Sequence, residues 1–108
     1  MEVHNTLGNG FQEVIYQRAL GLEFTKRGLG FVREEGRPIS YKDTYIGKRR
    51  VDFLVEDKVL VEIKAQGELN NAHLAQTLNY LRAFNLEIGL LINFGTKSVQ
   101  FRRLINTP

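Results

Sequence analysis

The stretch that decides the fold reads VDFLVEDKVLVEIK and spans residues 51–64. Its two halves, residues 51–55 and 59–64, are rich in β-forming side chains and short enough to be strands. Only the polar residues 56–58 separate them, so the sequence predicts a β-hairpin.

The register of this hairpin follows from its apolar side chains. If Val55 faces Val59 across the turn, Asp52 faces Glu62, because side chains alternate with period two. One face then holds only apolar residues: Val51, Phe53, Val55, Val59, Val61 and Ile63. A slip of one residue would set apolar side chains opposite the acids. The apolar face therefore selects the register that places two carboxylates side by side.

Two carboxylates in this position repel each other unless they share a proton or a cation. An oxygen-rich pair with spare coordination positions suits a hard divalent ion such as Mg²⁺. Lys64 follows Glu62 by two residues on the same face, where it either neutralises one acid or holds a water or phosphoryl oxygen beside the ion. The simpler alternative is a solvated face on which Glu62 and Lys64 form a surface ion pair. Because Leu54 and Leu60 lie on the same face as these charges, the face is better interpreted as the floor of a cleft than as open surface.

The chain of 108 residues and 12.4 kDa is expected to form one domain, residues 1–108. The absence of cysteine excludes disulfides, thiolate metal sites and cysteine nucleophiles. His4 and His73 are far apart, which argues against an all-histidine metal site, and both are interpreted as surface or helix-end residues. No apolar stretch is long enough to span a membrane and no signal peptide is present, so we expect a cytoplasmic protein without membrane contact.

The formal net charge is +3 and the pI is near 9.4. Basic residues gather at 26–27, 48–50 and 102–103. Such clusters either contact nucleic-acid phosphates or form a solvated surface. The second cluster leads directly into the acidic hairpin, and its members are interpreted as candidate phosphate contacts: Lys48, Arg49 and Arg50.

The rest of the chain surrounds this hairpin with helices and further strands. The expected helices are the tail of a helix at residues 1–7, a helix at 11–27, and a helix that Asn70 or Asn71 caps and that runs to about residue 84. The apolar face of the second helix is predicted to hold Phe11, Val14, Ile15, Ala19, Leu22 and Phe24. The other strands are expected at residues 31–35, 38–41, 44–46, 87–93 and 99–105. This order predicts an α/β sandwich with one mixed sheet, in which the third helix crosses over to a parallel strand.

Three motifs in this order resemble the PD-(D/E)XK nuclease superfamily and, within it, the GxxExxY family. The naming motif stands here as Gly10-Phe11-Gln12-Glu13-Val14-Ile15-Tyr16, the acidic motif as Asp52 followed by Glu62-Ile63-Lys64, and a third motif as Gln76-Thr77-Leu78-Asn79-Tyr80. The resemblance covers nearly the whole chain. It implies a restriction-endonuclease-like core of the order α-β-β-β-α-β, with a mixed sheet flanked by helices.

The resemblance also implies a metal site. Asp52, Glu62 and the Ile63 carbonyl would bind the ion, which would be Mg²⁺ or Mn²⁺, with Glu13 as a further ligand. Lys64 would orient or activate a water molecule. Judged by residue type alone, Glu13 is also explained as an acid that complements the positive start of its helix.

The same resemblance implies that Gln76, Tyr80 and Tyr16 contact the substrate or support the site. The alternative is that both tyrosines are core residues with a bonded hydroxyl and that Gln76 caps a loop. The chain departs from the family pattern in three places. Val51 stands where the superfamily's name has proline, Asn9 stands where the family often has proline, and residues 1–7 are only the end of a helix that is longer in the family.

The resemblance thus implies a metal-dependent nuclease that hydrolyses phosphodiester bonds, with DNA as the expected partner. The main alternative is a catalytically inactive, nuclease-like module that binds nucleic acid or a protein. Its apolar last strand would suit edge-to-edge pairing in a homodimer. A small-molecule hydrolase that uses the same carboxylates is a third class.

Overall fold

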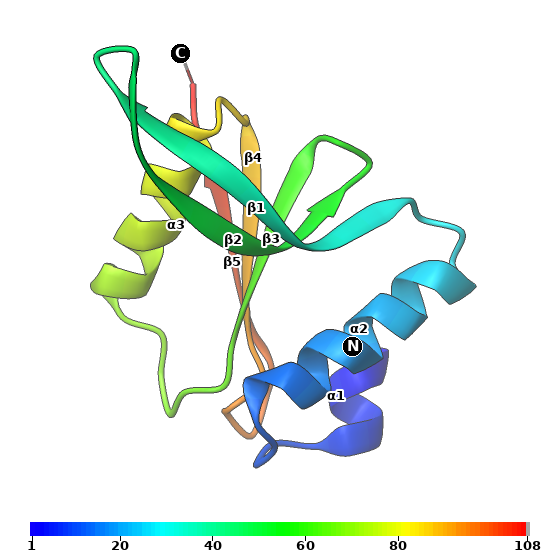
Figure 1. The fold of residues 1–108 in the computed structure, drawn as a ribbon. Coiled ribbons are helices and arrows are strands. Elements are labelled where there is room, and N and C mark those ends of the chain that lie inside the picture. The colour runs from blue at the N-terminus through cyan, green and yellow to red at the C-terminus, as the bar shows by residue number, and fades with distance from the viewer. Residues whose placement is uncertain (108) are drawn as a thin grey trace.

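The structure is a computed structural model that describes residues 1–107 (Figure 1). Along the chain its elements are α1 (Glu2–Leu7), α2 (Glu13–Lys26), β1 (Phe31–Tyr41), β2 (Thr44–Val55), β3 (Val59–Lys64), α3 (Asn71–Ala83), β4 (Ile88–Asn93) and β5 (Gln100–Ile105). The described strands form one sheet in the order β1-β2-β3-β4-β5. Its β3–β4 pair is parallel and the other pairs are antiparallel. The expected mixed sheet, flanked by helices and with a parallel crossover through α3, is confirmed.

The start of α3 shows why the crossover helix could be placed from sequence. The Asn70 side chain accepts a hydrogen bond from the His73 backbone at 3.0 Å, and the Asn70 backbone donates to the His73 ring at 3.2 Å. Together they form a reciprocal cap that satisfies two otherwise unpaired backbone donors. The prediction that His73 lies at a helix end is confirmed.

The sheet carries a hydrophobic core on each face. On one face α2 covers the α2-side core, whose buried members include Tyr16, Leu20, Phe53, Val61, Ile63 and Phe94. On the other face α3 covers the α3-side core, which consists of Val51, Leu60, Leu81 and Phe84. Figure 1 shows α1 and α2 together on one side of the sheet and α3 on the other. Side chains that alternate along β3 therefore contribute to two different cores.

The predicted apolar face of α2 is wrong in part. Leu22 is 69% exposed and Phe11 lies outside the helix, whereas the buried stripe consists of Tyr16, Gln17, Leu20 and Gly21. Gly21 also lies in this stripe, and a Cβ there would meet the rings of Phe31 and Phe53 in ordinary van der Waals contact at 3.7 Å. Counting apolar residues missed this face because its members include an amide and a glycine.

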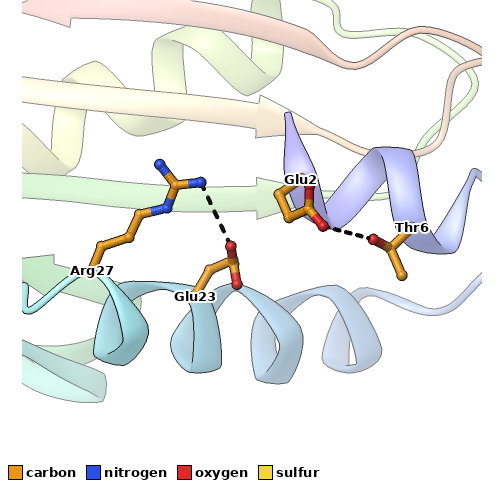
Figure 2. Close-up of polar contacts among 4 residues, drawn as sticks. All are labelled: Glu2, Thr6, Glu23 and Arg27. Atoms are coloured by element: carbon orange, nitrogen blue, oxygen red, sulfur yellow. Dashed lines mark hydrogen bonds and ion pairs between the residues drawn. The ribbon is translucent and has the colours of Figure 1, made fainter.

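α1 packs beside α2 through buried side chains. Val3 belongs to the α2-side core, and Leu7 packs against it. Figure 2 shows two polar contacts in this region that each stay within one helix: Thr6 donates to Glu2 at 3.2 Å on α1, and Arg27 pairs with Glu23 at 3.6 Å on α2. Exposed pairs of this kind contribute roughly 0.3–0.5 kcal/mol each, so apolar burial is the main force that holds α1 in place.

His4 lies in the last turn of α1, as the helix-end alternative expected, but it is buried and not at the surface. It is 8% exposed, its Nε2 lies 2.9 Å from the carbonyl oxygen of Thr96, and its ring stacks on Phe94. The sequence showed only a histidine near a chain end, whereas the fold brings the loop after β4 against α1. No helix within residues 1–107 is long and apolar enough to cross a membrane.

β1 and β2 are longer than the sequence indicated. The predicted strands at residues 31–35 and 38–41 join to form β1, because Pro38 is tolerated in an edge strand, and a turn at Lys42-Asp43 connects β1 to β2. On β2 only Phe53, Leu54 and Val55 pair with β3. Residues 36–50, called the arm below, therefore form a two-stranded ribbon that projects past the other strands (Figure 1).

Candidate active site

The hairpin register is as predicted over three pairs, Phe53–Val61, Leu54–Leu60 and Val55–Val59, and then β2 separates from β3. Val51 was expected to face Ile63 on the same apolar face as Phe53. Instead Val51 lies in the α3-side core and Phe53 in the α2-side core. That part of the prediction is wrong.

The regular alternation of side chains breaks down around Asp52 because β2 changes partners there. Beyond this point β2 pairs with β1 alone, and two-stranded ribbons twist more strongly than wider sheets. The β1–β2 ladder skips Asp52 and Glu34, and Glu34 has a left-handed backbone with φ 55°. The break in the sheet therefore falls at the carboxylate that the sequence singled out.

The Asp52 side chain occupies the position that a backbone partner would otherwise take. Its Oδ2 accepts a hydrogen bond from the Ile63 backbone N–H at 2.7 Å, and its Oδ1 accepts one from Gln17 Nε2 at 3.2 Å. Gln17 belongs to the buried stripe of α2 and is 6% exposed. Donors from β3 and α2 therefore fix the orientation of the carboxylate.

Glu62 is buried on β3 and is 8% exposed. Burial raises the pKa of its carboxyl to about 9, aided by a hydrogen bond with the Asp52 side chain and by the negative charge of Asp52. A hydrogen bond with the Asp52 backbone and the positive charge of Lys64 lower the pKa of Glu62 by smaller amounts. The two carboxyl groups are therefore close neighbours, and a proton on Glu62 relieves the repulsion between them.

A cleft of about 240 Å³ opens beside Asp52. It lies between α2 and the strands, and its lining residues are Glu13, Val14, Gln17, Glu34, Asp52 and Ile63. Three of these residues are acids, so the cleft attracts a cation and repels a phosphate group when no cation is bound there. Asp52 joins this cleft to buried Glu62.

The donor set at this cleft fits a divalent ion that keeps most of its waters. Within residues 1–107 the ion pairs are Arg27–Glu23 and Arg37–Glu35, so neither Asp52 nor Glu62 is paired with a basic side chain there. Asp52 accepts a hydrogen bond from Gln17 at one oxygen and from Ile63 at the other, and the lone pair that faces the Glu62 proton becomes available to an ion when that proton leaves. Mg²⁺ typically takes one or two protein carboxylates and several waters. In the described part of the chain no three His, Cys, Asp or Glu residues come together, so Glu13 shares the cleft without completing a three-residue ligand cluster.

The other predicted site residues are distributed around this centre. Lys64 ends β3, is half-buried and pairs with Asn93 on β4. Gln76 is exposed on α3, and Tyr80 packs against the α3-side core and stacks on Phe84. Neither Gln76 nor Tyr80 lines the cleft. The basic cluster lies on the arm and is exposed: Lys48, Arg49 and Arg50.

Tyr16 is fully buried, with 0% exposure, and stacks on Phe94 at 4.6 Å between ring centroids. Its hydroxyl donates to the Gly8 carbonyl at 2.6 Å and accepts from the Phe11 backbone N–H at 3.1 Å. These bonds close the turn between α1 and α2. This position matches the alternative of a core residue with a bonded hydroxyl.

Replacing Tyr16 with Phe should therefore destabilise the protein without a direct effect at the cleft. Two partly buried backbone groups, the Phe11 N–H and the Gly8 carbonyl, lose a partner, which costs about 1–3 kcal/mol and lowers the Tm by roughly 4–12 °C. The measurement is a thermal melt monitored by circular dichroism. Tyr80→Phe is the matched control, because no residue among 1–107 hydrogen-bonds that hydroxyl, and its Tm should be unchanged. An equal Tm shift in both variants would contradict the assigned role of the Tyr16 hydroxyl.

Two residues at the site were not identified from sequence. Gln17 orients Asp52, and buried Asn93 holds the loop after Lys64 through Gln66 N at 2.9 Å and Gln66 O at 3.1 Å. The only available signal was position: Gln17 lies four residues after Glu13, and Asn93 ends an otherwise apolar strand. Polar residues at such places are easily interpreted as solvated.

Residues 1–104 match a family model described as PD-(D/E)XK nuclease superfamily. The chain therefore belongs to this superfamily, as its three motifs indicated. The comparison with curated proteins gives no match.

Two solved structures are similar to this chain. One, described as the crystal structure of SSO0001, has a TM-score of 0.68 and 21% identity, and the match covers 89% of this chain and 51% of that one. The other, Hjc, a Holliday junction resolvase from the archaeal hyperthermophile Archaeoglobus fulgidus, has a TM-score of 0.46 and 19% identity, with 82% and 73% covered. The chain spans about half the length of the first structure. That first likeness supports the fold.

Proposed function

We propose that this chain is a metal-dependent nuclease that hydrolyses phosphodiester bonds, with Mg²⁺ as its ion and DNA as its substrate. The observation that carries the proposal is the contact between buried Glu62 and Asp52 at the edge of an acidic cleft. Membership of a nuclease superfamily also supports phosphodiester hydrolysis as the reaction. The motif Gly10-Phe11-Gln12-Glu13-Val14-Ile15-Tyr16 further supports a place in the GxxExxY family.

In this proposal Asp52, Glu62 and the Ile63 carbonyl hold the ion. The bound ion would lower the pKa of a coordinated water and stabilise negative charge on the attacked phosphate. Gln17 and the Ile63 N–H keep Asp52 in one orientation, since each donates to a different carboxylate oxygen. Lys64 places a positive charge near Glu62, where it would orient water and neutralise charge that develops on phosphoryl oxygens.

Glu13 lines the same cleft, where in this proposal it would help to hold water near the ion and would not bind the ion directly. The substrate roles of Gln76 and Tyr80 stay predictions, because both residues lie on α3, away from the cleft lining.

A second candidate function is a non-catalytic module that assembles through β5. This strand is at the edge of the sheet, and Phe101 and Ile105 on it are 44% and 51% exposed. An exposed edge with apolar side chains suits pairing with a second copy. Analytical ultracentrifugation of the protein and of Phe101→Lys distinguishes a dimer that depends on β5 from a monomer.

The test of the nuclease proposal is a cleavage screen of the purified chain. Labelled single-stranded DNA, duplex DNA and RNA are each incubated with Mg²⁺, Mn²⁺ or a chelator. Cleavage of DNA that requires a divalent ion supports the proposal. No cleavage of any substrate with either ion, by protein that gives a cooperative thermal melt, contradicts it and favours the non-catalytic module.

A further inference from the structure

The arm carries all of the net positive charge of the protein. Residues 36–50 contain five basic side chains and one acidic one, whereas the whole chain has a net charge of +3. The remainder is therefore slightly acidic, as is the cleft. A ligand phosphate would be attracted to the arm rather than to the cleft itself.

The strand register divides the basic cluster between the two faces of the arm. Arg49 pairs with Arg37, and this face continues through Val51 into the α3-side core. Lys48 and Arg50 pair with Pro38 and Gly36 on the opposite face. The orientation of Lys48 agrees with this assignment, because its side chain fills the space that a Cβ at Gly36 would occupy.

The face that holds Lys48 and Arg50 leads into the cleft. Asp52 is the next residue of this alternating row, and it lines the cleft on the α2 side of the sheet. In the other direction the register shifts by one residue between Ile39 and Ser40, so that Tyr45 and not Ile46 continues the row; Tyr45 pairs with Ser40 and is 62% exposed. At about 3.3 Å per residue, the row from Tyr45 to Asp52 is at most about 23 Å long. It consists of an exposed aromatic ring, two cations and the candidate site, in that order.

We infer that the row Tyr45, Lys48 and Arg50 binds one unpaired strand of the nucleic-acid substrate and guides it into the cleft. The inference rests on the proposed nuclease function for the identity of the ligand. Lys48 and Arg50 contact successive phosphates, which supply affinity that the acidic cleft cannot. Tyr45 stacks on an exposed base, and stacking needs a base that is not enclosed in a duplex. The substrate class is therefore single-stranded nucleic acid or the unpaired segment of a branched or frayed one.

The test measures binding by fluorescence anisotropy with a labelled single-stranded 20-mer and the blunt duplex of the same sequence, in chelator. The double variant Lys48→Gln/Arg50→Gln should weaken single-strand binding by about 10-fold or more and reduce the salt slope by about 1.4, because two phosphate contacts are lost. Tyr45→Ala should weaken single-strand binding by roughly 10-fold and leave duplex binding nearly unchanged. The matched control is Arg102→Gln/Arg103→Gln, which removes the same charge from exposed β5 and should have less than a third of that effect.

Equal losses in the arm and β5 double variants would overturn the inference, because affinity would then follow total charge. The inference would also be overturned if Tyr45→Ala weakened duplex binding and single-strand binding equally. It would be overturned as well if the arm variants changed the sedimenting mass of the protein but not its affinity for DNA. Cleavage is scored separately with Mg²⁺ or Mn²⁺. If the arm variants bind DNA more weakly but the unmodified protein cleaves nothing, only the proposed catalysis is contradicted. If the unmodified protein cleaves DNA but the arm variants bind it as well as the unmodified protein does, only the inference is contradicted.

Discussion

Replacing Asp52 with Asn should reduce metal-dependent cleavage by roughly 10²- to 10³-fold or more while the protein stays folded. The carboxylate is one of two groups proposed to hold the ion, and Asn removes its charge but keeps its shape. Asn is a better choice than Ala because the Asp52 Oδ2 accepts the Ile63 N–H at 2.7 Å. An alanine would leave that buried donor without a partner, at a cost of about 1–3 kcal/mol, and so would mix a folding defect with the catalytic one.

The measurement compares initial rates of cleavage with Mg²⁺ and thermal melts for the same preparations. Asp57→Asn is the matched control, since it makes the same substitution in the exposed turn of the same hairpin. Its rate should be close to that of the unmodified protein. A cleavage rate that Asp52→Asn leaves unchanged, with the control also unchanged, would show that the carboxylate pair is not the catalytic centre.

The parts of the fold that could be predicted from sequence are those with local signals. Asn70 marked the start of α3 because its side chain caps the helix, and the apolar run at residues 88–92 identified the buried strand β4. The hairpin register held wherever β2 and β3 pair, since each strand has one apolar face there. These features depend on a few neighbouring residues.

The parts that could not be predicted depend on which strand β2 pairs with. Period-two alternation placed Val51 and Phe53 on one face, but β2 leaves β3 between them and the two side chains enter different cores. The same change of partner frees Asp52 to bond Ile63 and Gln17 through its side chain. The sequence thus predicted that Asp52 and Glu62 are neighbours for a partly wrong reason: they come together where the hairpin opens.

The role of Gln17 was missed because the helix phase was wrong. An apolar face that begins at Phe11 turns Gln17 toward solvent, whereas α2 begins at Glu13 and buries Tyr16, Gln17 and Leu20. Glycine and amide side chains in the buried stripe weaken the hydrophobic pattern on which such predictions depend.

Raising the pH should destabilise the metal-free protein, and Glu62→Gln should remove most of this effect. The pKa of the Glu62 carboxyl is about 9 in the fold, chiefly because of burial, against an ordinary value of 4.5. Between these values the folded state keeps a proton that the unfolded chain releases. Stability contributed by this group is therefore lost as pH rises from about 5 toward 9, by at most roughly 1.4 kcal/mol per pH unit. Gln resembles the protonated carboxyl and does not ionise.

Thermal melts of the two proteins from pH 5 to pH 9 test this expectation. The Tm values should be similar at pH 5, and Glu62→Gln should be the more stable by roughly 5–10 °C at pH 8.5. Glu68→Gln is the control for loss of an exposed charge, and its curve should run parallel to that of the unmodified protein. Parallel curves for Glu62→Gln would contradict the assignment of a shared proton to the carboxyl pair.

The same proton should govern metal binding. A divalent ion at Asp52 and Glu62 must displace the proton that they share, so its affinity rises as pH approaches the pKa of Glu62. The increase in Tm caused by a fixed Mg²⁺ concentration should therefore be larger at pH 8.5 than at pH 6.5, and should be absent in Glu62→Gln at both. A Mg²⁺-dependent Tm increase that is equal in Glu62→Gln would place the ion elsewhere, because an amide oxygen cannot replace the charge of the carboxylate.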